Sequence, residues 1–246
     1  MKNALFVFGL GWLLGLSARA DQQIQSGPRR VDLIELYTSE GCSSCPPAER
    51  WLSGLESSPQ LWKSVVPVSF HVNYWDNLGW KDRFAEKLFT ERQYTYANIW
   101  KTDSVYTPCF VYNGAQWTPS NAFNGSDTSP GKLIATFASP RHLNVSFFPI
   151  PRVKTEMDVW ASLTVSEIGS EVTRGENAGK KLIHDFVARE LVCTGLLNNA
   201  DGSYSASLDF SENSTRQNGR QAVAIWITPH RSLQTVIQAC GAWVEK

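Results

Sequence analysis

The feature that most limits how this chain can fold is a pair of cysteines, Cys42 and Cys45, at the point where an apolar segment gives way to a helical pattern. Residues 31–37 are short and mostly apolar, which is typical of a strand covered on both faces. Apolar side chains then recur at helical spacing over residues 48–55. Two thiols at i and i+3 can close a disulfide, and a helix N-terminus stabilises a thiolate on the first of them. The sequence therefore predicts a strand, a dithiol and a helix in direct succession.

A Cys-x-x-Cys pair has three common meanings: half of a zinc site, a structural disulfide, or a redox-active dithiol. A zinc site needs a second ligand pair at matching spacing, but Cys193 and Cys240 are isolated and the four histidines have no such spacing. A disulfide across two residues constrains the unfolded chain little, which argues against a purely structural role. The pattern favours the redox-active dithiol, and we expect neither a metal ion nor a cofactor.

The N-terminus has the features of an export signal. Lys2 is followed by an apolar run over residues 4–16 and by an A-x-A cleavage site that ends at Ala20. The run is shorter than the roughly 20 residues that a membrane-spanning helix needs, although a retained anchor is the alternative. We expect cleavage near Ala20, a mature chain without a membrane span, and a periplasmic or secreted location.

Composition restricts the partners. The chain has 23 basic and 23 acidic residues, and cleavage would remove Lys2 and Arg19 but no acid. A slightly acidic mature chain lacks the basic excess that binds nucleic acid, so we expect no nucleic-acid partner.

The hydrophobic pattern changes its character near Pro140. Before it, the pattern predicts a strand over residues 65–74, a helix over 82–99, a hairpin and a helix over 131–138. After it, the pattern predicts strands separated by turns, which is typical of an all-β unit. These strands are expected at residues 144–148, 159–165, 186–193, 204–210 and 222–228.

This order resembles the thioredoxin fold, in which a later proline is cis and packs beside the disulfide. Thr107-Pro108 stands at the matching place. The predicted fold is α/β: a thioredoxin-like fold with an enlarged helical insertion, followed by a C-terminal all-β, sandwich-like domain. The expected divisions are a signal peptide over residues 1–20, a thioredoxin-like domain over 21–140 and a β-rich domain over 141–246.

Several longer motifs resemble an exported bacterial family, the domain of unknown function 1223. They are ELYTSEGCSSCPPAE at 35–49, HVNYWD at 71–76, LGWKD at 78–82, YTP at 106–108 and, near the C-terminus, GENAG at 175–179 with Leu182 and His184-Asp185. The resemblance implies a thioredoxin-like fold and export, but no characterised reaction. Where relatives commonly have Gln after the hairpin proline, this chain has Cys109.

Four residues are the candidates for the chemistry. Cys42 is expected to be the exposed nucleophile with a lowered pKa, and Cys45 the buried resolving thiol. Pro108 is expected beside the disulfide. Glu35, inside an apolar strand, is a candidate proton acceptor for Cys45, or else a surface ion pair at a strand edge.

Other residues have two possible roles each. Trp75, Trp80 and Thr107 are candidates for binding an extended polypeptide, although aromatic residues are more often part of the core. His71 is either a core histidine or part of a site at a sheet edge. Cys109 is either a third redox thiol or a small buried side chain.

The sequence thus predicts an exported thiol–disulfide oxidoreductase that acts on protein thiols and disulfides. One alternative is a soft-metal protein that binds Cu(I) through the same thiols, with His71 as a possible third ligand. Another is a non-catalytic binding protein on a thioredoxin scaffold.

Overall fold

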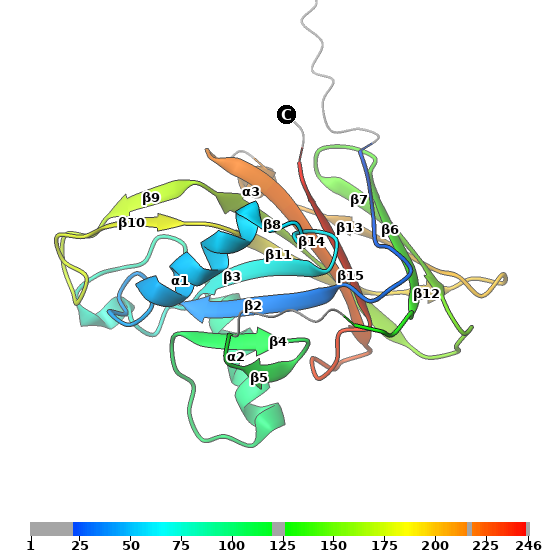
Figure 1. Ribbon diagram of the computed structural model, residues 1–246, viewed down its shortest axis with the longest axis horizontal. Coiled ribbons are helices and arrows are strands. Elements are labelled where there is room, and N and C mark those ends of the chain that lie inside the picture. The colour runs from blue at the N-terminus through cyan, green and yellow to red at the C-terminus, as the bar shows by residue number, and fades with distance from the viewer. Residues whose placement is uncertain (1–21, 120–125, 216–217, 245–246) are drawn as a thin grey trace, which may run out of the picture.

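The computed structural model describes residues 22–119, 126–215 and 218–244, and Figure 1 shows how their elements are arranged. Among these residues, strands far outnumber helices. No helix in this part of the chain is long and apolar enough to cross a membrane. The expected export signal and its cleavage site lie outside the described residues.

The largest element of the fold is an eight-stranded mixed sheet. Strands β2 and β3 are parallel and in register from Asp32–Val65 to Thr38–His71. Strand β11 pairs with β3 in parallel, whereas the other neighbours are antiparallel. In spatial order the strands are β15 (Gln238–Trp243), β14 (Arg220–Pro229), β8 (Met157–Ser166), β11 (Val187–Gly195), β3 (Val65–His71), β2 (Asp32–Thr38), β4 (Cys109–Tyr112) and β5 (Ala115–Trp117).

Two helices cover opposite faces of this sheet. Helix α1 (Pro46–Ser53) packs with Ile34 and Leu36, whereas α2 (Lys87–Trp100) packs with Tyr37. Successive side chains of a strand point to opposite faces, so the two helices lie on different sides of β2. Short 3-10 helices follow α1 and β3, at η1 (Gly54–Ser57) and η2 (Asp76–Leu78).

A second sheet packs on the β8–β14–β15 part of the first. Its five strands are antiparallel, and its inward side chains share one apolar core with those of the large sheet. In order they are β1 (Gln23–Gln25), β6 (Gly131–Phe137), β7 (His142–Pro149), β13 (Tyr204–Asp209) and β12 (Leu197–Asn198). A short helix, α3 (Glu212–Thr215), follows β13.

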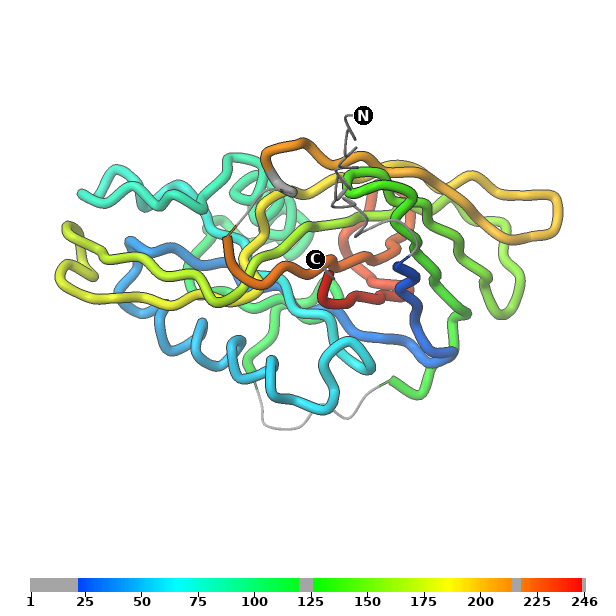
Figure 2. Tube along the Cα trace, turned by 90° about the horizontal axis from the view of Figure 1, so that it is seen from above, coloured from blue at the N-terminus to red at the C-terminus, as the bar shows by residue number. Residues whose placement is uncertain are grey.

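A separate two-stranded hairpin extends from the large sheet. Strands β9 (Ile168–Glu171) and β10 (Lys181–His184) pair only with each other. The hairpin runs along α1 toward the start of that helix, as both views show (Figures 1 and 2).

The predicted α/β class is wrong, because the described part of the chain is mostly β-sheet in three sheets. The expected enlarged helical insertion is not found: α2 is the one α-helix between β3 and β4. The helix expected over residues 131–138 is strand β6, whose buried residues Leu133, Ala135 and Phe137 have the period of two that a strand requires. The helix was expected because Ser129-Pro130 precede this segment and proline is favoured at the first position of a helix.

Apart from the β9–β10 hairpin, no sheet in the described residues consists only of strands from the expected all-β unit after Pro140. Strands from both sides of that residue share the large sheet through the β3–β11 pair. Several local predictions are nevertheless confirmed: strands near residues 31–37 and 65–74, a hairpin with Asn113-Gly114 as its turn, and a helix that overlaps the expected range 82–99 but runs from Lys87 to Trp100.

Candidate functional site

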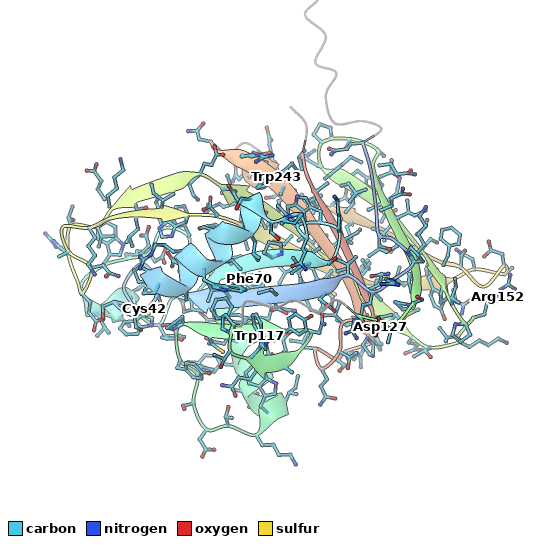
Figure 3. The ribbon with its side chains drawn as sticks, in the orientation of Figure 1. Cys42, Phe70, Trp117, Asp127, Arg152 and Trp243 are labelled. Carbon is cyan, nitrogen blue, oxygen red and sulfur yellow. A yellow bond between two sulfur atoms is a disulfide. The ribbon has the colours of Figure 1, made fainter. Side chains whose placement is uncertain are left out.

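Cys42 and Cys45 form a disulfide with a Cα–Cα distance of 5.5 Å, in the loop that joins β2 to α1. Cys45 is the N-cap residue of α1, and a proline follows at the first helical position, where a missing N–H costs nothing. Figure 3 places Cys42 at the start of α1. The expected cysteine pair is therefore confirmed as a disulfide at a helix start.

Neither cysteine reaches the surface. Cys42 and Cys45 are both 0% exposed, whereas Ser43 and Ser44 between them are exposed. The prediction of an exposed Cys42 is wrong, because the segment between β9 and β10 covers it. Any reaction at this disulfide requires that cover to move.

We call the covering segment, residues 172–180, the hairpin loop. The side-chain amide of buried Asn177 donates hydrogen bonds of 2.9 Å to the carbonyl oxygens of both Glu40 and Cys42. Lys180 Nζ donates to Asn177 Oδ1 at 2.9 Å. The backbone N–H of Ser43 donates to the Glu176 carboxylate at 3.0 Å, and hydrogen bonds from the Ser43 side chain and backbone lower the pKa of that carboxyl group. The hairpin loop thus forms hydrogen bonds with both the carbonyl oxygen and the N–H of the Cys42–Ser43 peptide bond.

Behind the disulfide lies a group of buried ionisable side chains, which we call the carboxylate–histidine cluster. Its members are all buried and come from five different regions of the chain: Glu40 in the β2–α1 loop, Glu49 in α1, His71 at the end of β3, Asp82 in the loop after η2, and His184 at the end of β10. Glu49 follows Cys45 by one helical turn and therefore lies on the same side of α1.

His184 bridges two carboxylates of the cluster. Its Nδ1 lies 2.9 Å from Glu49 Oε2 and its Nε2 lies 3.1 Å from Glu40 Oε1. Burial lowers the pKa of His184, but the hydrogen bonds that its ring N–H groups donate to Glu40 and Glu49 outweigh it and raise the pKa to about 10. For the Glu49 carboxyl group, burial has the opposite effect and raises the pKa, but the hydrogen bond with His184 brings the pKa below its usual value. A protonated His184 therefore holds the two glutamates together.

The second histidine pairs with one carboxylate only. His71 Nδ1 lies 2.7 Å from Asp82 Oδ2, and the attraction to His71 outweighs burial and lowers the pKa of Asp82. The other nitrogen of His71, Nε2, is buried without a hydrogen-bond partner. Among the residues that the structure describes, Glu49, His71 and His184 form the group that can hold a metal ion. One ligand atom of each lies within 4.8 Å of those of the other two.

Three residues predicted to bind substrate lie around the same loop. Trp80 Nε1 donates to Glu40 Oε2 at 2.7 Å, and Trp75 Nε1 donates to Thr107 Oγ1 at 2.8 Å. Trp75 also packs against Gly41, where a Cβ atom would lie 3.0 Å from that of Trp75. All three side chains are half-buried. The Thr107–Pro108 peptide bond is cis as expected.

Glu35 takes part in a different set of contacts. Arg92 of α2 donates to both of its carboxylate oxygens, at 2.9 and 3.0 Å, and the hydroxyls of Tyr37 and Tyr96 donate to it at 2.7 and 2.6 Å. These partners occupy both carboxylate oxygens on the face of the sheet that α2 covers. The disulfide lies at the start of α1, on the opposite face.

The third cysteine of the region is buried and free. Burial raises the pKa of the Cys109 thiol to about 11, which suppresses the reactive thiolate at neutral pH. This matches the reading of Cys109 as a small buried side chain. Cys193 and Cys240 are free as well, the first exposed and the second buried.

Sequence reasoning assigned no role to Glu40, Glu49, Asp82, Asn177 or His184. Each lies within or beside a motif quoted above, but nothing local indicates that these side chains meet. Glu49 gave the one readable signal, a carboxylate one helical turn after Cys45.

An open groove adjoins the exposed side of the disulfide loop. It is lined by Ser43, Pro46, Pro47 and Arg50 on one side and by Lys180 and Lys181 of the hairpin on the other. The groove gives an approach to the Ser43–Ser44 peptide between two basic walls.

Comparison with solved structures shows the same fold in two bacterial proteins. AGR_C_4864 from Agrobacterium tumefaciens is 23% identical, with 87% of this chain and 94% of that chain covered and a TM-score of 0.63. HBP35 of Porphyromonas gingivalis is 15% identical, with 89% of this chain and 76% of that chain covered and a TM-score of 0.63. At these identities the likeness concerns the fold alone.

No curated protein matches this chain at a significant level. One family model does match, over residues 33–228, and its description is "Protein of unknown function (DUF1223)". Since the match spans most of the sequence, the chain belongs to the DUF1223 family.

Proposed function

We propose that this protein is an exported thiol–disulfide oxidoreductase in which Cys42 and Cys45 are the reactive pair and protein thiols and disulfides are the substrates. The observation that carries the proposal is the Cys42–Cys45 disulfide at the first turn of α1, beside an open groove. A helix N-terminus favours a thiolate there once the disulfide is reduced. The export signal predicted over residues 1–20 supports a compartment in which disulfides persist.

The reaction is a pair of exchange steps. A substrate thiolate attacks Cys42 Sγ, the Cys42–Cys45 bond breaks, and Cys45 leaves as a thiolate. A second substrate thiolate then attacks the substrate sulfur of the mixed disulfide and releases Cys42. The two protons lost by the substrate thiols balance those taken up by the two cysteines, and two electrons pass to the protein. In the reverse direction the dithiol reduces a substrate disulfide.

The surroundings support selective access. The groove reaches Ser43, and the hairpin loop covers Cys42 through Asn177. A polypeptide that enters the groove can lie between Arg50 and Lys181, with Trp75, itself bonded to Thr107, beside Gly41 of the disulfide loop. Segments with acidic residues near the reacting cysteine suit this groove best.

Trapping tests the proposal. Cys45→Ser removes the resolving thiol, so mixed disulfides through Cys42 should accumulate in cells and appear on non-reducing gels. The matched control is Cys193→Ser, which removes an exposed free thiol and should trap nothing. The double variant Cys42→Ser/Cys45→Ser should also be free of adducts. Absence of adducts in Cys45→Ser, with no wild-type activity on a disulfide-bonded protein, would refute the proposal.

The reduction potential decides the direction. Equilibration of the pure protein with glutathione or dithiothreitol buffers gives the potential of the Cys42–Cys45 couple. A potential near about −120 mV identifies an oxidant of exported proteins, and one near about −270 mV identifies a reductant.

A further inference from the structure

His71 is the least satisfied polar side chain around the disulfide. It is 0% exposed, and its Nε2 has no hydrogen-bond partner. Buried polar atoms nearly always have a partner, so an orphaned imidazole nitrogen requires an explanation. Since Nδ1 faces Asp82 at 2.7 Å, a neutral His71 that donates from Nδ1 presents a lone pair at Nε2.

Two further ligand atoms converge on the same place. Atoms of Glu49, His71 and His184 lie within 4.8 Å of one another, and the three side chains come from α1, β3 and β10. Within this group, His184 Nδ1 and Glu49 Oε2 are 2.9 Å apart, a separation that two ligands of one ion also show. Three elements of the fold thus place one carboxylate oxygen and two imidazole nitrogens within 4.8 Å of one another.

The outer contacts of both imidazoles follow the pattern of metal-binding histidines. A metal-bound histidine usually gives its other nitrogen to a carboxylate, which fixes the ring and its tautomer. His71 has Asp82 in this position, and His184 has Glu40 at its Nε2. An accidental cluster of polar side chains does not require a carboxylate behind each ring.

We propose that Glu49, His71 and His184 bind a divalent transition-metal ion such as Zn²⁺, one helical turn from the disulfide. Two imidazoles and one carboxylate suit zinc or iron(II), whereas calcium and magnesium prefer oxygen ligands. The ion takes the place of the proton shared by His184 and Glu49 and supplies a partner for His71 Nε2. A double positive charge also offsets the three buried carboxyl groups of the cluster.

Binding requires a small contraction of the group. Ligands of a tetrahedral ion at about 2.0 Å lie roughly 3.3 Å apart, so the widest pair must close from the 4.8 Å limit by side-chain rotation. The ion can enter when the hairpin loop opens, because His184 lies at the base of that hairpin.

Zinc titration of the mature protein, with its disulfide intact, tests the site. After treatment with a chelator, calorimetry with ZnCl₂ should show one ion per chain. His71→Gln and Glu49→Gln should each weaken binding at least tenfold, and Asp82→Asn should weaken it by about 10–100-fold through the outer contact. The matched control is His142→Gln, which removes a histidine that also pairs with a carboxylate at 2.7 Å but lies half-exposed on the other sheet. It should bind zinc like the wild type.

A second readout keeps the test independent of folding defects in the variants. Cobalt(II) bound to the wild type should give visible d–d absorption without a sulfur-to-metal charge-transfer band, because the ligands are nitrogen and oxygen. The proposal is overturned if the oxidised wild type takes up no zinc, or if His71→Gln binds as tightly as the wild type. Zinc uptake that appears only after reduction and is lost in Cys42→Ser would also overturn it, by placing the ion on the thiols.

Discussion

Asn177→Ala should expose the disulfide without altering either cysteine. The Asn177 amide is buried and donates two hydrogen bonds of 2.9 Å, one to each carbonyl oxygen that flanks the start of the disulfide loop. Alanine removes both donors and keeps the backbone. The hairpin loop then loses its main polar attachment to the Cys42 segment.

The structure sets the size of the effect. A buried hydrogen bond contributes about 1 kcal/mol net, so loss of two destabilises the closed loop by about 2 kcal/mol. Each 1.4 kcal/mol is a factor of about ten in a population, so the open form should increase by roughly 30-fold. Because both cysteines are 0% exposed, a reductant must wait for opening, and its rate follows the open population.

The assay is the rate of disulfide reduction by dithiothreitol, followed by acid quench, denaturation and thiol labelling. Asn177→Ala should be reduced about 30 times faster than the wild type under native conditions. Asn199→Ala is the matched control, because the Asn199 amide also donates two hydrogen bonds. Its acceptors are the hydroxyls of Ser203 and Ser205, in a turn of the other sheet. An unchanged rate in Asn177→Ala, or equal acceleration in both variants, would refute gating by the hairpin loop.

Three more predictions concern stability and reactivity. Arg92→Met leaves the Glu35 carboxylate buried without its cation and should lower the free energy of unfolding in urea by about 3–5 kcal/mol. Lys87→Met, which breaks an exposed pair on the same helix, should cost less than about 1 kcal/mol, and similar losses in both would contradict this reasoning. In the reduced protein at pH 8, iodoacetamide should leave native Cys109 unmodified, because burial raises its pKa to about 11; rapid alkylation would show that the thiol is accessible and ionised. Gly114→Ala should lower the melting temperature, since φ is +91° there and a Cβ would lie 2.3 Å from a carbonyl oxygen; an unchanged melting temperature would mean that the hairpin turn can shift.

Local patterns predicted the parts of the fold that depend on neighbouring residues. The apolar run before Cys42 is a strand, the spacing after it gives a helix, and Asn113-Gly114 joins two paired strands. In each case the chemistry that decides the structure lies within a few residues. Helix α2 was found for the same reason, although its first turn begins later than the apolar pattern indicated.

The class of the fold depends on pairings that no local pattern contains. Strand β11 lies beside β3 through a contact between Val187 and Ser69, and this pair joins the early strands to the later ones in one sheet. Alternating segments after Pro140 predicted strands correctly but could not say which partner each strand would take. A helix was expected at residues 131–138 because a Ser-Pro pair precedes them. In the structure every second residue is buried, including Leu133 and Phe137, which is the pattern of a strand.

The candidate site was half predictable for a related reason. The cysteines reveal themselves by their spacing, but Asn177 is 135 residues from Cys42, and His184 is 144 residues from Glu40. A carboxylate such as Glu40 inside a turn looks like a solvated residue until the partner that buries it is known. Glu35 shows the converse: of the two alternatives open for it, its full burial excludes the surface ion pair, and its charged partner is Arg92 of α2.

The hairpin of β9 and β10 is the element that connects the two parts of the candidate site. The hairpin carries Asn177, which is bonded to Cys42, and His184, which belongs to the carboxylate–histidine cluster. One hairpin therefore contributes to both sides of the disulfide loop. Asn177 and His184 lie on the same hairpin, so we expect displacement of the loop from Cys42 to disturb the hydrogen bonds of His184 with Glu40 and Glu49. Under the proposed function, we therefore expect exposure of the disulfide to be accompanied by rearrangement of the buried charges, and a substrate that opens the hairpin to affect both.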